Sequence, residues 1–302
     1  MRNYDVDEGD GAAPVQPKRG ETVQHRLTCA SIVIVVAAVE LALCLLPPAF
    51  ADAPSAGWDP ETYAVADRAF SVQYPRLPPQ GSLILSIDHR AFQPMDEKPF
   101  SSLLGFDSGN LTIGLGVRYS LLDSLDIGVE RYNATVTDYD TYEFNSRFQL
   151  LAEDRGLADI AIGGGLTWFD AESLSDEYGG MAEVLIGQTL FGKLYVTSGV
   201  MYHSRPAVMT GTEDVPHYSA AVLATANLLV MERVALVTEW SIPVAGAWEG
   251  SPAWSAGPKV YSFGHTFSLV VSNAHDISDD RLAAGSTRWN HPIFGFTITR
   301  QL

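Results

Sequence analysis

Residues 111–119 read Leu-Thr-Ile-Gly-Leu-Gly-Val-Arg-Tyr, and the pattern of this stretch decides the fold. Apolar side chains occupy every second position, and threonine, glycine and arginine stand between them. A period of two places the two sets on opposite faces of a β-strand. Strands in soluble proteins average about five or six residues, whereas a strand that crosses a bilayer needs about 9–11. This stretch therefore favours a membrane strand.

The same alternation recurs along most of the chain after residue 82. It is clear at 83–91, 142–150, 263–271 and 294–298, and weaker at 125–133, 157–168, 180–190, 193–203, 217–228 and 234–242. The connections between these segments alternate between long, as at 92–109, and short, as at 120–124. Outer-membrane barrels have longer external loops and short periplasmic turns. The sequence predicts an all-β fold, a closed antiparallel up-and-down transmembrane β-barrel, with a soluble periplasmic ligand-binding barrel or sandwich as the alternative.

The number of strands follows from parity. Eleven segments can be counted, with 260–272 as the tenth, and bacterial single-chain barrels have an even number. We expect a twelfth short strand at 280–286, which places the turn at 274–279 in the periplasm. The rival interpretation puts the extra strand at Phe70–Tyr74 and leaves 274–290 as a long loop.

The N-terminal part predicts export. Basic residues precede an apolar run at 27–46, and Ala49-Phe50-Ala51 forms a small-x-small site, as in a secretory signal peptide. We expect cleavage after Ala51; an uncleaved anchor is the alternative. The predicted division is a signal peptide at 1–51, an irregular Pro-rich segment at 52–80 and a barrel at 81–302.

Charge and cysteine content exclude several classes of protein. The formal net charge is −17, which argues against nucleic-acid binding, because that needs clustered Lys and Arg. The only cysteines, Cys29 and Cys44, lie in the predicted signal peptide, so the mature chain has no thiol for a disulfide or a metal. The sequence also lacks a metal-spaced set of ligands and a phosphate loop, and we expect no metal and no cofactor.

Both ends of the predicted barrel resemble a known family of bacterial outer-membrane β-barrel proteins, described only as a domain of unknown function. The resemblance rests on 81–90 and 104–107 for the opening strands, and on 264–269, 272–273, Trp289 and 294–300 for the closing ones. One departure is the end of the chain, Gln301-Leu302, where family members tend to have an aromatic residue. The resemblance implies a fold and a location in the cell outer membrane, and no substrate.

Strict alternation also predicts which charged side chains face the lumen. A charge facing lipid costs roughly 2–4 kcal/mol for Arg or Lys near the midplane, so inward placement is expected. The candidate lumen or pore-lining residues are Asp88, Arg90, Arg118, Glu130, Glu143, Arg147, Asp159, Glu183 and Glu239. They either pair with one another and fill a closed lumen or line a small polar pore. We expect Arg118, Glu143 and Arg147 to form one network.

No catalytic residue is predicted. His203-Ser204 is adjacent at a strand end but has no placed acidic partner, and His265 is more typical of a hydrogen-bonded interfacial histidine. We therefore expect a narrow channel, a transport barrel or a structural barrel, and no enzyme; a lipid-directed barrel enzyme is the alternative. The expected partners are outer-membrane lipid, lipopolysaccharide, the barrel assembly machinery and a small polar solute.

Overall fold

The computed structural model describes residues 67–91, 95, 111–133, 139–171, 177–206, 217–262, 264–275, 277–287 and 289–302. The predicted signal peptide and its cleavage site lie outside the described residues. Among the helices described, none is long and apolar enough to span a membrane.

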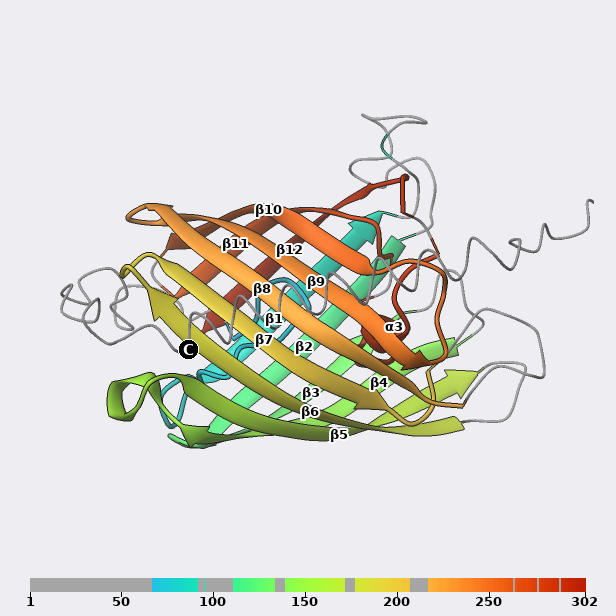
Figure 1. The fold of residues 1–302 in the computed structure, drawn as a ribbon, viewed down its shortest axis with the longest axis horizontal. Helices are drawn as coiled ribbons and strands as arrows, with labels where there is room; N and C mark the ends of the chain where they lie inside the picture. The colour runs from blue at the N-terminus through green and yellow to red at the C-terminus, as the bar shows by residue number, and fades with distance from the viewer. Residues whose placement is uncertain are drawn as a thin grey trace, which may run out of the picture.

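Twelve antiparallel strands form one closed barrel (Figure 1). They are β1 (Leu83–Ala91), β2 (Leu111–Leu122), β3 (Leu125–Tyr132), β4 (Tyr139–Leu151), β5 (Asp159–Ala171), β6 (Glu177–Leu190), β7 (Leu194–His203), β8 (Ser219–Met231), β9 (Val234–Gly246), β10 (Ala253–Ser262), β11 (His265–Ser272) and β12 (Ile293–Gln301). Each strand pairs with its neighbours in sequence, and β1 pairs with β12 to close the wall. The predicted barrel and its twelve strands are confirmed.

The position of one strand was predicted wrongly. The strand that the sequence analysis missed is β10. Residues 280–286, where the additional strand was expected, lie instead in the short helix α3 (Asp279–Ala284) and the turn after it. Gly257 and Pro258 made β10 look like a loop, because proline cannot donate to a sheet ladder. The pairing of β10 with β11 indeed leaves a gap between Ala256 and Lys259. Gly264, with φ +78°, forms part of the tight turn that divides the strand predicted as 260–272 between β10 and β11.

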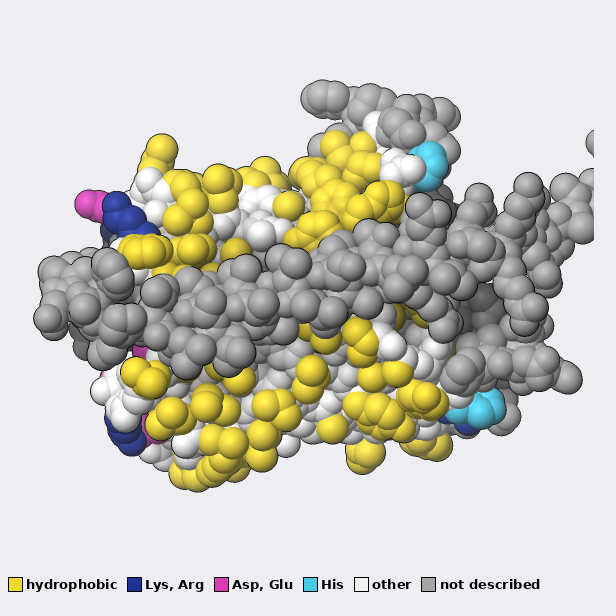
Figure 2. Space-filling model, in the orientation of Figure 1, with side chains coloured by type: hydrophobic (Ala, Val, Ile, Leu, Met, Phe, Trp, Pro, Cys, Tyr) yellow, Lys and Arg dark blue, Asp and Glu magenta, His cyan; other side chains and the backbone are white. Residues whose placement is uncertain are grey.

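The two ends of the barrel differ in the length of their connections. One end has the short turns, such as 123–124 and 232–233, together with the C-terminus; the other has the longer connections, including 92–110 and 273–292. We call them the short-turn end and the long-loop end. On the visible outer wall, hydrophobic side chains predominate between the ends and charged ones gather near the ends (Figure 2). Leu115 and Val117 of β2, for example, are each 48% exposed, as expected of a lipid-facing surface.

Two segments that are not part of the wall occupy the interior. Residues 67–74, which we call the inner hairpin, are all buried, and α3 folds in against β7, β8 and β9 (Figure 1). Arg68 and Gln73 form an isolated antiparallel bridge, so the rival prediction of a wall strand at Phe70–Tyr74 is also wrong. The barrel thus encloses parts of its own chain.

Candidate functional site

The nine predicted lumen residues all lie on the inner side of the wall. Each is at most 4% exposed: Asp88, Arg90, Arg118, Glu130, Glu143, Arg147, Asp159, Glu183 and Glu239. Two further buried charges, Asp126 and Lys259, were not on that list. Alternation in β3 could have found Asp126, which precedes Glu130 on the same face, whereas Lys259 lay at the edge of a predicted loop.

The inner hairpin is a compact turn that leaves much of its backbone open to partners. The amide of Ala69 donates to the carbonyl of Val72, and the amide of Tyr74 donates to the carbonyl of Asp67, each over 2.8 Å. The amides of residues 70–72 and the carbonyls of residues 68, 69 and 74 therefore need other partners, because a buried backbone group without one is costly. Charged side chains of the wall supply them.

Glu239 of β9 accepts three consecutive amides of the hairpin. Its Oε2 lies 3.0 Å from the nitrogen of Phe70, 2.9 Å from that of Ser71 and 3.1 Å from that of Val72. Successive amides that converge on one point form a concave anion-binding nest. The hairpin turn is thereby fixed to one carboxylate of the wall.

Two cations of the wall hold the hairpin carbonyls. Lys259 of β10 donates from Nζ to the carbonyl of Arg68 over 2.8 Å and also to that of Ala69. Arg147 of β4 donates from Nη1 to the carbonyls of Asp67, over 2.9 Å, and Tyr74, over 2.7 Å. Cations thus bind the carbonyls of the hairpin and a carboxylate binds its amides; Glu239 and Lys259 come from the neighbouring strands β9 and β10, and Arg147 comes from β4.

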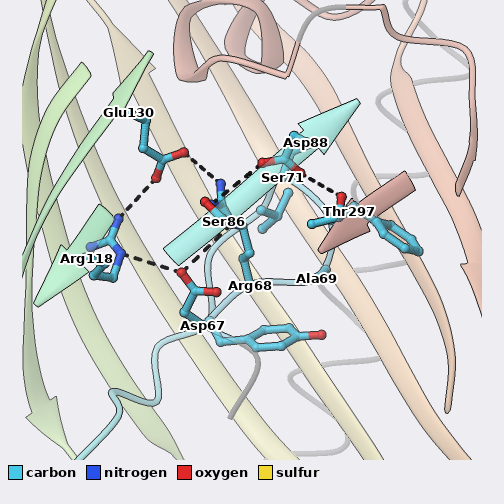
Figure 3. A network of polar contacts seen from close by, with 12 residues as sticks. Asp67, Arg68, Ala69, Ser71, Ser86, Asp88, Arg118, Glu130 and Thr297 are labelled. Carbon is cyan, nitrogen blue, oxygen red and sulfur yellow. Dashed lines mark hydrogen bonds and ion pairs between the residues drawn. The ribbon is translucent and has the colours of Figure 1, made fainter. Parts of the chain in front are cut away.

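The hairpin contributes one cation of its own (Figure 3). Arg68 pairs with Glu130 over 2.8 Å, donates to Ser86 over 2.6 Å and lies 3.8 Å from Asp88, whose other oxygen accepts from Thr297. Burial by itself would lower the pKa of Arg68, but the nearby carboxylates outweigh it and hold the pKa well above its usual value. Arg68 is thus charged inside the barrel.

The network predicted for Arg118, Glu143 and Arg147 is formed in a different way. Asp126 joins the two arginines: Arg118 donates to it over 2.8 Å, and Arg147 pairs with its other oxygen. Glu143 instead accepts the amide of Asp279, at the start of α3, over 2.7 Å. The wall therefore has one arginine–aspartate cluster and a separate carboxylate that faces α3.

Helix α3 is held from the long-loop end. Ser241 donates to the carbonyl of Leu282 over 2.5 Å, Ser219 donates to that of Ala283, and Arg281 pairs with Glu249 over 2.7 Å. Burial, then the carboxylates of Glu183 and Glu130, raise the pKa of Asp279 well above its usual value.

The hairpin and α3 share one apolar cluster. Val72 of the hairpin and Leu282 and Ala283 of α3 belong to it together with Met181, Leu185, Met201 and Leu223 of the wall. The other side of the hairpin, including Phe70 and Tyr74, packs into a second cluster with Tyr195 and Tyr261. Apolar side chains therefore pack against both sides of the hairpin inside the barrel.

Glu183 of β6 differs from the other inner carboxylates. Its side chain is 4% exposed, yet neither of its oxygens has a hydrogen-bond partner within the described part of the chain. Asp279 of α3 and the arginine–aspartate cluster are its charged neighbours. This carboxylate thus stands in the lumen without the pairing that holds Glu239 and Glu130.

The histidine–serine pair does not form a nucleophile–base arrangement. His203 Nε2 lies 2.9 Å from Thr167 Oγ1, and its Nδ1 accepts the amide of Arg205. Ser204 Oγ accepts the amide of Gly180 over 2.8 Å. His265, the other histidine considered, lies at the start of β11, where its Nε2 is 2.6 Å from Arg300 Nη1. Both histidines have local partners.

A model of the family described as "Membrane bound beta barrel domain (DUF5777)" matches residues 66–302. The chain belongs to this family. The match covers the inner hairpin as well as the wall, so the DUF5777 domain includes both. Family membership also supports a location in the outer membrane. No curated protein matches the chain.

Several solved outer-membrane proteins are similar to this DUF5777 protein at low identity. A mutant of the Rh. blastica porin is 11% identical with a TM-score of 0.33, over 64% of this chain and 56% of the porin, less than two thirds of its length. The Acinetobacter baumannii outer membrane protein Omp33 is 8% identical with a TM-score of 0.40, over 74% and 98%. Outer membrane phospholipase A from Escherichia coli is 10% identical with a TM-score of 0.39, over 78% and 98%. Similarities of this size identify no activity.

Proposed function

We propose that this protein is an outer-membrane barrel that provides a normally closed passage for small polar solutes, and that the inner hairpin closes it. The observation that carries the proposal is the way in which the hairpin is held. It lies inside the barrel without being part of the wall, and buried charges from β3, β4, β9 and β10 bind it.

The charges are the physical argument for an open state. A buried ion pair costs desolvation, and well-packed apolar residues in its place are often as stable or more stable. An interior that served only to fill the barrel would not need Glu130, Glu239, Arg147 and Lys259 at the hairpin. In an open state, water can solvate the same side chains once the hairpin leaves, as it does in the polar lumen of porins.

Bilayer conductance tests the proposal. The wild-type protein should be closed for most of the recording, because the hairpin fills the lumen. Arg68→Glu replaces the cation that pairs with Glu130 over 2.8 Å by a carboxylate, and should raise the open fraction strongly. Arg68→Lys keeps the positive charge at the same position and is the matched control, with an open fraction near that of wild type. If folded Arg68→Glu is as closed as Arg68→Lys, the passage proposal fails.

The remaining sequence-based expectations belong to the same proposal. The exposed apolar wall supports contact with outer-membrane lipid and lipopolysaccharide, and delivery by the barrel assembly machinery follows from that location. N-terminal sequencing of the membrane form should start at Asp52 if the signal peptide is cleaved after Ala51. We still expect no enzymatic activity, and a lipid hydrolysis assay that detects turnover would contradict this expectation.

A further inference from the structure

We infer that the open passage prefers cations, because withdrawal of the inner hairpin takes a cation away from a wall that carries more carboxylates than positive charges. This inference rests on the proposed function and names its class of solute. The starting point is the charge of the described inner wall. It carries seven carboxylates, Asp88, Asp126, Glu130, Glu143, Asp159, Glu183 and Glu239, and four cations, Arg90, Arg118, Arg147 and Lys259.

Three of the four wall cations keep wall partners when the hairpin leaves. Arg118 and Arg147 both remain on Asp126. Arg90 remains on the carbonyl of Phe296, over 3.2 Å, and next to Thr297. Lys259 loses both of its acceptors, the carbonyls of Arg68 and Ala69. Arg118 and Arg147 thus keep a carboxylate between them, whereas Arg90 keeps neutral acceptors only.

The carboxylates behave in the opposite way. Glu130 loses Arg68, its closest cation, and keeps Arg118 at 3.6 Å and the hydroxyl of Tyr132. Glu239 loses all three hairpin amides. Asp88 loses Arg68 and keeps the Thr297 hydroxyl. Departure of the hairpin thus frees Glu239 and takes the shared cation Arg68 from Glu130 and Asp88, while it frees one lysine.

A further carboxylate lies toward α3. Glu183 already has no hydrogen-bond partner among the described residues. Glu143 faces the same segment, through its bond to the amide of Asp279. Carboxylates that line a narrow low-dielectric passage raise the local cation concentration and exclude anions. Glu130 and Glu143 are register partners on the neighbouring strands β3 and β4, so two of these carboxylates lie side by side on the wall.

Reversal potentials in a tenfold KCl gradient test the inference. Two full-length variants open the lumen through substitutions in the hairpin, Arg68→Glu and Val72→Lys. The first adds negative charge and the second adds positive charge, and the wall is unchanged in both. Val72 belongs to the buried apolar cluster, so a lysine there should displace the hairpin. Both variants should shift the reversal potential toward the roughly 59 mV of an ideally cation-selective pore. Agreement between the two variants assigns the preference to the wall.

Removal of wall charges then locates the selectivity. Glu130→Gln with Glu239→Gln, added to either open variant, should lower the permeability of K⁺ relative to Cl⁻. Glu232→Gln, in the exposed β8–β9 turn, removes one carboxylate outside the lumen and should leave the ratio unchanged.

The outcomes separate the two proposals. Conductance without a cation preference, or with an anion preference, overturns the inference and leaves the passage standing. Folded open variants that do not conduct at all overturn the passage, and the inference with it. Folding is checked by the heat-dependent electrophoretic mobility of the barrel. If neither variant folds, the same ratio is measured on the voltage-induced openings of the wild-type protein, and the same outcomes decide.

Discussion

Replacement of Glu239 by glutamine should release the inner hairpin without unfolding the barrel. The structure gives the size of the effect, because one carboxylate oxygen accepts three buried amides. Hydrogen bonds to a charged group contribute about 1.5–3 kcal/mol each, and those to a neutral one about 0.5–1.5. The change loses about 1 kcal/mol per bond, or about 3 kcal/mol for the nest. That is roughly a hundredfold shift toward the released hairpin.

Amide hydrogen exchange of the purified barrel measures this shift at the residues concerned. Protection of the amides of residues 70–72 should fall by about two powers of ten, while protection of the wall strands stays the same. Glu183→Gln is the control, since it makes the same substitution at a buried carboxylate that has no hydrogen-bond partner among the described residues. Equal protection of residues 70–72 in wild type and Glu239→Gln would refute the nest as the hold on the hairpin.

Three further predictions concern the wall, α3 and the long-loop end. Arg147→Leu should lower the free energy of unfolding by about 3–5 kcal/mol in urea titrations, because it removes a charged donor to two buried hairpin carbonyls, at about 1.5–3 kcal/mol per bond, while Asp126 keeps Arg118. Unchanged stability would show that these contacts contribute nothing. Burial and neighbouring carboxylates raise the pKa of Asp279, so its contribution to stability is full below the usual pKa of about 3.9 and is lost as the pH rises through the raised pKa. Asp279→Asn should flatten this part of the plot of unfolding free energy against pH. An identical plot for the variant would contradict the raised pKa. A cysteine at Trp289, which is 48% exposed, should react with a membrane-impermeant thiol reagent on intact cells, whereas one at Ile277, 4% exposed, should not; equal labelling would contradict the buried position of Ile277.

The wall was predictable because its signal is local. Alternation alone gives the inner and outer faces of β2, for example, and buries Arg118 while it exposes Val117. The same rule found nine of the eleven charged residues of the inner wall. Lys259 was missed because Gly257 and Pro258 hide β10 in the sequence.

The inner segments were not predictable in this way, because their structure comes from distant partners. The hairpin is fixed by Glu130, Glu239 and Lys259, which are 62 to 191 residues away from the positions they bind. Helix α3 has only six residues, and isolated helices of that length are not stable in water. Its order depends on the wall serines that bind its last carbonyls, so a sequence pattern restricted to 280–286 carries too little information to identify it.

The position of the hairpin before β1 in the chain also fixes the order in which the barrel can be assembled. The segment is synthesised first among the described residues, but its binding site is complete only when β10 has joined β9 and the seam between β1 and β12 has closed. Contacts between such distant positions form slowly, because a long loop must close before they are made. Enclosure of the hairpin is therefore coupled to closure of the seam. If the sheet curls around residues 67–74 as it grows, the hairpin is already inside when β12 pairs with β1.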